Sequence, residues 1–273
     1  MGAVAAKLEK KQYQHGDVIM EVRNLTKYFP VRLSFIQSLK TDKPPVLKAV
    51  DNVSFDVYKG EVLGIVGESG CGKTTLARTI LRLTDATSGS VALEDVDIMK
   101  LNPIEMKNLR RKMQVIFQDP YESMNPRMDV QTIISEPLRI QGIASTVHQA
   151  RDVVASVLAD VEMIPPEEYM SRYPHELSGG QRQRVAVARA LALDPDFIVA
   201  DEPVSMLDVS IRGEVLNLML NLSREKGVTF VYITHDLATA RHICDRIAVM
   251  YLGKIVEMGT AEEVIRNPLH PYT

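Results

Sequence analysis

The chain has 273 residues, of which 45% are hydrophobic, enough for one large domain or for one domain with an attached lobe. Its net charge of −3, its lack of tryptophan and its aromatic content of 5% speak against nucleic acid as a partner. Two cysteines make no disulfide framework, no apolar run approaches the length of a bilayer span, and the N-terminus lacks a signal-peptide stretch. We therefore expect a protein of a reducing cytoplasm that does not itself cross a membrane.

The N-terminal part of the chain predicts a polar start followed by strands. Residues 1–17 are polar and rich in Lys and Gln, which predicts disorder. Residues 18–27 predict a first strand, and residues 52–58 and 90–97 predict strands of an antiparallel edge sheet. Residues 30–45 are expected to form a longer loop.

A glycine-rich segment then stands between an apolar run, 61–66, and a run with helical spacing, 75–82. It fits G-x-x-x-x-G-K-[ST], in which glycines let backbone N–H groups wrap a phosphate at a helix start. A Gly/Ser turn could match by chance, but the flanking strand and helix oppose that reading. Lys73 would neutralise the β- and γ-phosphates, and Thr74 would bind Mg²⁺. The predicted nucleotide contacts are Gly67, Ser69, Gly70, Cys71, Gly72, Lys73, Thr74 and Thr75.

Three further apolar runs each end in polar side chains; the runs are 113–117, 197–200 and 229–234. In open α/β sheets ligands bind at the carboxyl ends of the strands, so these side chains should share one edge. Asp201 is predicted to reach Mg²⁺, directly or through water, and Glu202 to polarise the attacking water. His235 would hydrogen-bond the γ-phosphate, and Gln118 would sense the metal or the water. The alternatives are an acidic strand end that caps the next element and a structural or surface histidine.

Strand signals vanish after Gln118, and residues 151–163 show helical spacing, so an inserted helical lobe is predicted over 119–177. Later in the chain, residues 211–226 predict a helix and residues 247–258 a hairpin that turns at Leu252-Gly253.

A second anion-binding helix start follows the lobe. Ser178 and Gln181 have the spacing of a capping box, which alone would explain both residues. It does not explain Gly179 and Gly180, which bare backbone N–H groups at the helix start and favour an anion. Because the chain already has one phosphate site, this second one should serve the nucleotide of a neighbouring molecule.

In this order the segments resemble the ATP-binding-cassette family, whose signature stands complete as Leu-Ser-Gly-Gly-Gln at 177–181. The resemblance covers roughly residues 18–273. It implies an α/β fold with a P-loop NTPase core, in which helices flank a mostly parallel sheet, an antiparallel β subdomain and an inserted α-helical subdomain. The core and β subdomain would occupy 18–118 and 178–260, the helical subdomain 119–177, and the start of a C-terminal extension 261–273.

The resemblance also implies roles for single residues, with ATP and Mg²⁺ as cofactors. Tyr28 would stack on adenine, and Glu202 would be the general base, supported by His235, Gln118 and Lys73 as catalytic residues. Thr74, Gln118 and Asp201 would hold the metal, and Gln118 would couple the site to a membrane partner. In a head-to-tail dimer, the ATP contacts supplied by the other subunit would be Ser178, Gly179, Gly180, Gln181 and Asp208.

Segments 118–127, 173–176 and 267–273 are similar to ATPase subunits of oligopeptide and dipeptide importers, a subgroup that also imports oligosaccharides or nickel. Its members usually continue beyond the last motif, so a truncated chain is one expectation. The implied partners are two transmembrane permease subunits, a second ATPase subunit, identical or homologous, and an extracytoplasmic substrate-binding protein. The implied location is the cytoplasmic face of the cell membrane.

The sequence opposes two other classes of protein. A soluble ATPase of DNA repair or translation would carry long coiled coils or two cassettes, and this sequence shows neither sustained heptads nor a second cassette. A non-catalytic regulatory subunit is opposed by intact Lys73, Glu202 and His235.

Overall fold

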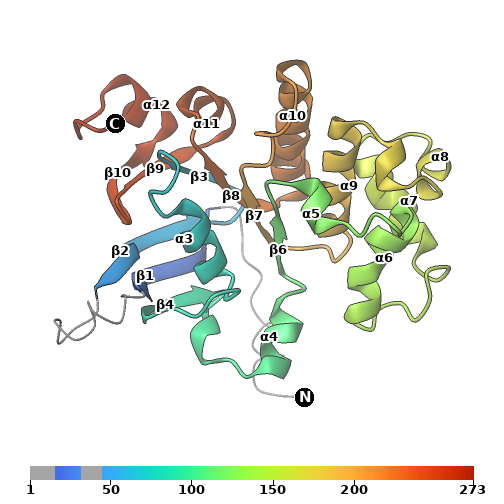
Figure 1. Ribbon diagram of the computed structural model, residues 1–273, viewed down its shortest axis with the longest axis horizontal. Helices are drawn as coiled ribbons and strands as arrows, with labels where there is room; N and C mark the ends of the chain where they lie inside the picture. The colour runs from blue at the N-terminus through green and yellow to red at the C-terminus, as the bar shows by residue number, and fades with distance from the viewer. Residues whose placement is uncertain (1–15, 32–44) are drawn as a thin grey trace, which may run out of the picture.

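The computed structural model describes residues 16–31 and 45–273 as two β-sheets, the helices around them and a helical lobe (Figure 1). The disorder predicted for residues 1–17 and the loop predicted for 30–45 fall almost entirely outside the described residues. Among the described helices, none combines the length and the apolar character needed to cross a bilayer.

The larger sheet has the strand order β10-β9-β3-β8-β7-β6, with only β10 antiparallel to its neighbour. Its strands are β10 (Lys254–Thr260), β9 (Arg246–Tyr251), β3 (Val62–Val66), β8 (Thr229–Thr234), β7 (Phe197–Asp201) and β6 (Met113–Ile116). Every residue of β3, β7 and β8 is buried, as the unbroken apolar runs predicted.

The smaller sheet is antiparallel, with the order β2-β1-β4-β5. Its strands are β1 (Val18–Pro30), β2 (Val46–Tyr58), β4 (Ser88–Leu93) and β5 (Val96–Asp97). The strand predicted over 52–58 therefore begins earlier, and the one predicted over 90–97 is a hairpin. Glu94 and Asp95 both have positive φ, at 49° and 63°, the backbone that a two-residue hairpin turn requires.

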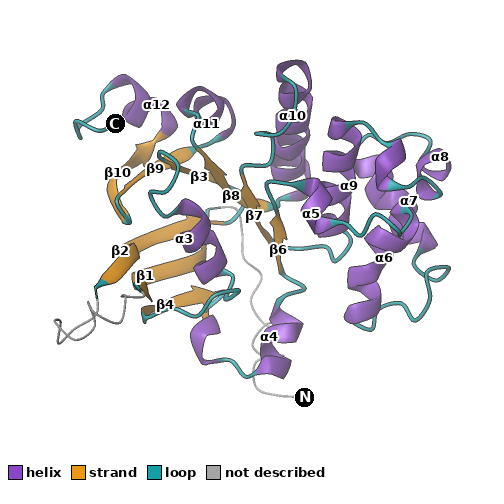
Figure 2. Ribbon diagram, viewed as in Figure 1, coloured by secondary structure: helices purple, strands orange, loops and turns teal. Residues whose placement is uncertain are grey.

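Helices cover both faces of the larger sheet and form the separate lobe. Outside the lobe they are α3 (Lys73–Ile80), the 3₁₀ turn η1 (Ile98–Lys100), α4 (Pro103–Leu109), α10 (Val209–Lys226), α11 (Leu237–Ile243) and α12 (Ala261–Arg266). The lobe holds α5 (Pro120–Ser123), α6 (Val130–Ile140), α7 (Arg151–Asp160), α8 (Pro166–Met170) and the 3₁₀ turn η2 (Pro174–Glu176), and α9 (Gly179–Leu191) follows it and packs against α5, α6 and α7. Figure 2 shows the lobe at the opposite end of the molecule from the antiparallel sheet.

The period-two alternation of β3 divides the core into two clusters. Val62 and Val66 pack into the cluster formed with α10, α11 and the lobe, whereas Leu63 and Ile65 pack into the cluster formed with α3 and the antiparallel sheet. Helix α3 therefore lies between the two sheets (Figure 1). The predicted mostly parallel sheet with flanking helices, an antiparallel sheet and an inserted helical lobe is confirmed.

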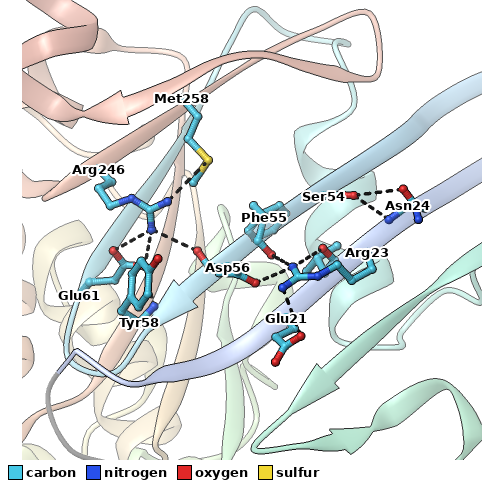
Figure 3. Close-up of polar contacts among 11 residues, drawn as sticks. Glu21, Arg23, Asn24, Ser54, Phe55, Asp56, Tyr58, Glu61, Arg246 and Met258 are labelled. Atoms are coloured by element: carbon cyan, nitrogen blue, oxygen red, sulfur yellow. Dashed lines mark hydrogen bonds and ion pairs between the residues drawn. The ribbon is translucent and has the colours of Figure 1, made fainter.

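A polar network joins the two sheets near the start of β3 (Figure 3). The Arg246 guanidinium donates to the carbonyl of Asp56 and to the Glu61 carboxylate, at 3.2 Å each, and lies over the Tyr58 ring. The Asp56 carboxylate also pairs with Arg23 of β1, at 2.5 Å. Burial raises the pKa of Glu61, and the Arg246 charge opposes that rise. The network thus ties the start of β9 and the residue before β3 to the antiparallel sheet.

Candidate functional site

One open cavity of about 750 Å³ gathers most of the residues that the sequence selected. Its lining residues are Phe29, Leu47, Lys48, Ala49, the loop from Glu68 to Thr75, Gln118, Glu202, His235, Leu252 and Gly253. The loop lies between β3 and α3, and the three polar residues follow β6, β7 and β8. Four neighbouring strands thus deliver their carboxyl ends to one site, as the parallel topology requires.

The loop from Gly67 to Thr74 leaves backbone donors open at a helix start. Gly72 is the N-cap of α3 with a φ of 112°, and no side chain caps the helix. The first N–H groups of α3 therefore keep their capacity to bind an anion. A Cβ on Gly67 would lie 2.2 Å from the carbonyl oxygen of Met250, and one on Gly72 would lie 2.0 Å from that of Ala49. Only glycine fits at these two positions.

Lys73 lies folded against the loop that precedes it. Its side chain is buried, and its Nζ donates to the carbonyl oxygens of Gly67 and Glu68 at 2.6 and 2.9 Å. The ammonium is thereby held beside the open N–H groups, where an anion would gain from both. Burial raises the pKa of the neighbouring Cys71 thiol, although the Lys73 charge opposes the rise. Cys71 is therefore a neutral, structural part of the loop rather than a thiolate.

Glu202 is held by the residues that end the two adjacent strands. Its Oε2 accepts a hydrogen bond from Gln118 Nε2 at 3.2 Å, and its Oε1 lies 3.2 Å from His235 Nδ1. Its backbone has a φ of 47°, the left-handed region that non-glycine residues rarely occupy. The backbone N–H of Glu202 donates a hydrogen bond to the Ile233 carbonyl oxygen at 2.9 Å, which holds this conformation. A carboxylate oriented on both oxygens beside a phosphate cradle is suited to accept a proton from water.

Asp201 and Thr74 form the part of the site that fits a magnesium ion. The Thr74 hydroxyl donates to Asp201 Oδ1 at 3.4 Å. Burial raises the pKa of Asp201, and the Thr74 hydrogen bond opposes that rise. A buried carboxylate beside a hydroxyl supplies the hard oxygen donors that Mg²⁺ takes together with substrate phosphates. Gln118 directs its amide N–H to Glu202, so a metal bond through its amide oxygen stays a prediction.

The stacking role predicted for Tyr28 stays a prediction, and the described lining of the cavity includes Phe29 but not Tyr28. The Tyr28 hydroxyl donates to the Asp51 carboxylate, and Lys48 lies over its ring at 5.3 Å. Adjacent residues of a strand face opposite sides, so only one of the two aromatic rings can face the nucleotide. Phe29 lines the cavity, and Lys27 lies over its ring at 4.9 Å.

The second helix start has the predicted capping box but lies apart from the cavity. Ser178 Oγ accepts from the Gln181 N–H at 3.3 Å, and Gln181 Oε1 accepts from the Ser178 N–H at 3.0 Å. Ser178 is exposed, and none of residues 178–181, all of them described, lines the cavity. Asp208, the N-cap of α10, is also exposed and makes no side-chain cap bond. The chain thus brings together the cradle, Gln118, Asp201, Glu202 and His235, but not the segment 178–181 or Asp208.

Comparison with known proteins gives concordant matches. The family model described as ABC transporter matches residues 50–205. The oligopeptide transport ATP-binding protein OppF of Bacillus subtilis (strain 168) is 53% identical over 228 residues, which is 83% of this chain and 74% of that protein. The oligopeptide transport ATP-binding protein AppF of the same strain is 48% identical over 258 residues, which is 94% of this chain and 76% of that protein.

Solved structures match over most of the chain. The dimeric ATP-binding cassette MJ0796, in a post-hydrolysis state bound to ADP and Pi, matches with a TM-score of 0.75 at 29% identity, covering 89% of this chain and 98% of that one. CbiO1 from Clostridium perfringens, part of the ABC transporter complex CbiONQ, matches with a TM-score of 0.76 at 25% identity, covering 92% of both chains.

Proposed function

This chain belongs to the ABC transporter family, and we propose that it is the ATP-hydrolysing subunit of a membrane importer of di- or oligopeptides. The observation that carries the hydrolytic part is Glu202, oriented by Gln118 and His235 at the mouth of a glycine-rich phosphate cradle. The peptide substrate rests on the two oligopeptide transport relatives, at 53% and 48% identity.

The phosphate loop, Phe29 and the polar residues at the strand ends each have a task in the proposed reaction. The N–H groups of residues 69–74 and the Lys73 ammonium hold the phosphates, and the Phe29 ring stacks on adenine. Glu202 polarises the attacking water and accepts its proton, while His235 and Gln118 keep the carboxylate aimed at that water. Thr74 and Asp201 would hold Mg²⁺, which neutralises phosphate charge when bound.

The site is completed by a second ATPase subunit, identical or homologous. Support comes from the Ser178–Gln181 segment, which has an exposed Ser178 and lies outside its own chain's cavity, and from the dimeric state of MJ0796. Two chains arranged head to tail would place each signature segment, together with Asp208, over the other chain's cradle. ATP would close this dimer and hydrolysis would reopen it.

The motion has to be passed to other proteins, because a nucleotide site alone moves no solute. We propose two transmembrane permease subunits and an extracytoplasmic substrate-binding protein as partners, which places this chain at the cytoplasmic face of the cell membrane. CbiO1, one of the matching structures, is itself part of a transporter complex. The helical lobe, which follows Gln118 directly, is the element suited to carry the motion.

Two measurements test the proposal. Purified chain should release phosphate from Mg-ATP, and Lys73→Ala should abolish that release because the buried ammonium is lost. Tagged chain recovered from gently solubilised membranes should carry two permeases and a peptide-loaded binding protein. Turnover equal to that of Lys73→Ala would refute the ATPase, and recovery only with ribosomes or DNA would refute the importer.

A further inference from the structure

The C-terminal segment, residues 267–273, has no role in the proposed reaction, yet it folds back onto the core. The Glu257 carboxylate of β10 accepts the N–H groups of Leu269 and His270, at 2.8 and 3.0 Å. The Tyr272 N–H donates to His270 Nδ1 at 3.2 Å, and the Thr273 N–H donates to the His270 carbonyl at 2.9 Å. The segment is thus a hydrogen-bonded turn anchored on β10.

This turn brings Tyr272 to the phosphate loop, 204 residues away in sequence. The Tyr272 hydroxyl accepts a hydrogen bond from the N–H of Glu68 at 2.8 Å. Its half-buried ring packs against Tyr251, with the ring centroids 4.3 Å apart and the planes at 37°. Tyr251 ends β9, just before Gly253, whose N–H donates to the Cys71 carbonyl at 2.8 Å. The loop is therefore held from outside at two backbone points.

The peptide unit that Tyr272 holds also carries the acceptor for Lys73. The N–H of Glu68 and the carbonyl of Gly67 belong to one planar trans peptide, so they point in opposite directions. The N–H points outward to Tyr272, and the carbonyl points inward to Lys73 Nζ at 2.6 Å. Because the peptide is planar, the hydrogen bond that fixes the Glu68 N–H also fixes the direction of the Gly67 carbonyl. The Tyr272 hydroxyl thereby sets where the Lys73 ammonium lies in the cradle.

We propose that Tyr272 is a positioning residue that preorganises the phosphate loop for nucleotide, acting through the Gly67–Glu68 peptide on Lys73. The inference rests on the proposed ATP site and extends it, because it gives the C-terminal segment control over nucleotide affinity. Preorganisation lowers the cost of ordering the loop when the phosphates bind, so the effect falls on binding. The side chains that orient Glu202 are Gln118 and His235, which do not belong to this segment, so the hydrolytic step is spared.

Tyr272→Phe tests the proposal, because it removes one hydroxyl and keeps the ring. A lost hydrogen bond of ordinary strength predicts an ATP dissociation constant raised about three- to tenfold, with kcat at saturating ATP within about twofold of wild type. Without nucleotide, the Glu68 amide should exchange its hydrogen faster. Tyr251→Phe is the matched control, because the Tyr251 hydroxyl makes no hydrogen bond to the described residues; it should leave both readouts unchanged.

The outcomes separate this inference from the proposed function. Wild-type chain that binds ATP, with Tyr272→Phe equal to it in affinity and in Glu68 exchange, would overturn the inference and leave the ATP site standing. A lower kcat with unchanged affinity would also overturn it. Wild-type chain that fails to bind ATP would overturn the proposed function and the inference together. Thermal unfolding of both variants near the wild-type midpoint would exclude a general loss of structure as the cause.

Discussion

The phosphate loop, residues 67–74, and the signature segment, residues 177–181, are two glycine-containing helix starts with similar local chemistry and different surroundings. The loop is braced by Lys73, by Gly253 and by Tyr272, and it lines the large cavity. The signature segment is braced by the capping box of Ser178 and Gln181 and lies outside that cavity. A helix start can bind an anion in either place, but in this chain only the loop has the rest of the site around it.

The largest effect should come from disabling the phosphate loop in one chain and the signature segment in another. Lys73→Ala disables the loop and Ser178→Arg disables the signature segment, so each variant alone should be inactive. In a mixed head-to-tail dimer, one site carries both defects and the other carries neither. Mixing equal amounts should therefore restore phosphate release to about a quarter of the wild-type rate, if subunits pair at random and the sites act independently.

The complementation has a built-in control. Mixing Lys73→Ala with a second loop variant, Gly72→Ala, leaves every site with a defective loop, so no activity should return. Failure of the first mixture to recover, while both variants remain folded and pair with one another, would mean that one intact site made from two chains does not support phosphate release.

Glu202→Gln should separate binding from hydrolysis at the loop. The substitution keeps the size of the side chain and an oxygen that can accept from Gln118, but it replaces the other oxygen with an NH2 group and removes the base, which predicts a fall in phosphate release of about 100-fold or more. ATP should still bind, and gel filtration with Mg-ATP should show a dimer that persists. A monomer under these conditions would weaken the head-to-tail pairing for the isolated chain, and a loss of only severalfold would assign the base elsewhere.

Phe29→Ala should weaken ATP binding at the end of the cavity proposed to hold adenine. Loss of an aromatic stacking surface predicts ATP affinity reduced by about fivefold or more, with little change in turnover at saturation. Inorganic triphosphate, which has no base, should bind both proteins equally in the same titration. Tyr28→Ala is the neighbouring control and should have the smaller effect on affinity, because its hydroxyl is engaged by Asp51. The reverse ranking would identify Tyr28 as the stacking residue.

Tyr28 and Phe29 also show where sequence reasoning ends. Apolar runs buried on both faces identified β3, β7 and β8, and polar residues at their ends identified Glu202 and His235, because those signals are local. Which aromatic ring faces the cavity depends on strand register instead. The pairing of β1 with β2 shifts register around Lys27 and Tyr28, and a one-residue shift exchanges the two faces of a strand.

Two other features of the fold, helix α6 and the contact of Tyr272 with Glu68, could not be predicted from local sequence patterns. Helix α6 was predicted only as part of a lobe, because Pro137 lies inside it and proline normally ends a helix. The contact of Tyr272 with Glu68 joins residues 204 positions apart, and no local pattern encodes such a pairing. Local chemistry therefore predicted which polar residues meet at the cavity, whereas the supports of the loop required the folded chain.

The smallest effect should distinguish the two glycines of the signature segment by stability alone. A Cβ on Gly180 would lie 2.6 Å from Ile211 Cγ2, closer than atoms can pack, whereas one on Gly179 would lie 3.5 Å from Leu207 Cδ2, an ordinary contact. Gly180→Ala should therefore lower the free energy of unfolding by about 1–3 kcal/mol, and Gly179→Ala should leave it nearly unchanged. Denaturant unfolding of the nucleotide-free chain measures both.

The obstacle at Gly180 is a side chain, whereas the obstacle at Gly72 is the backbone carbonyl of Ala49, at 2.0 Å. The clash at Gly180 can be relieved by shortening the Ile211 side chain, whereas no substitution removes the backbone carbonyl that obstructs Gly72. Adding Ile211→Ala to Gly180→Ala should therefore cost less than the sum of the two single substitutions. If the two losses in the free energy of unfolding were strictly additive, a clash with Ile211 would not be the cause of the Gly180→Ala effect. With the clash relieved, any remaining loss of ATPase activity would report on the anion-binding N–H groups themselves, separating the packing role of this glycine from its role toward the neighbouring chain's nucleotide.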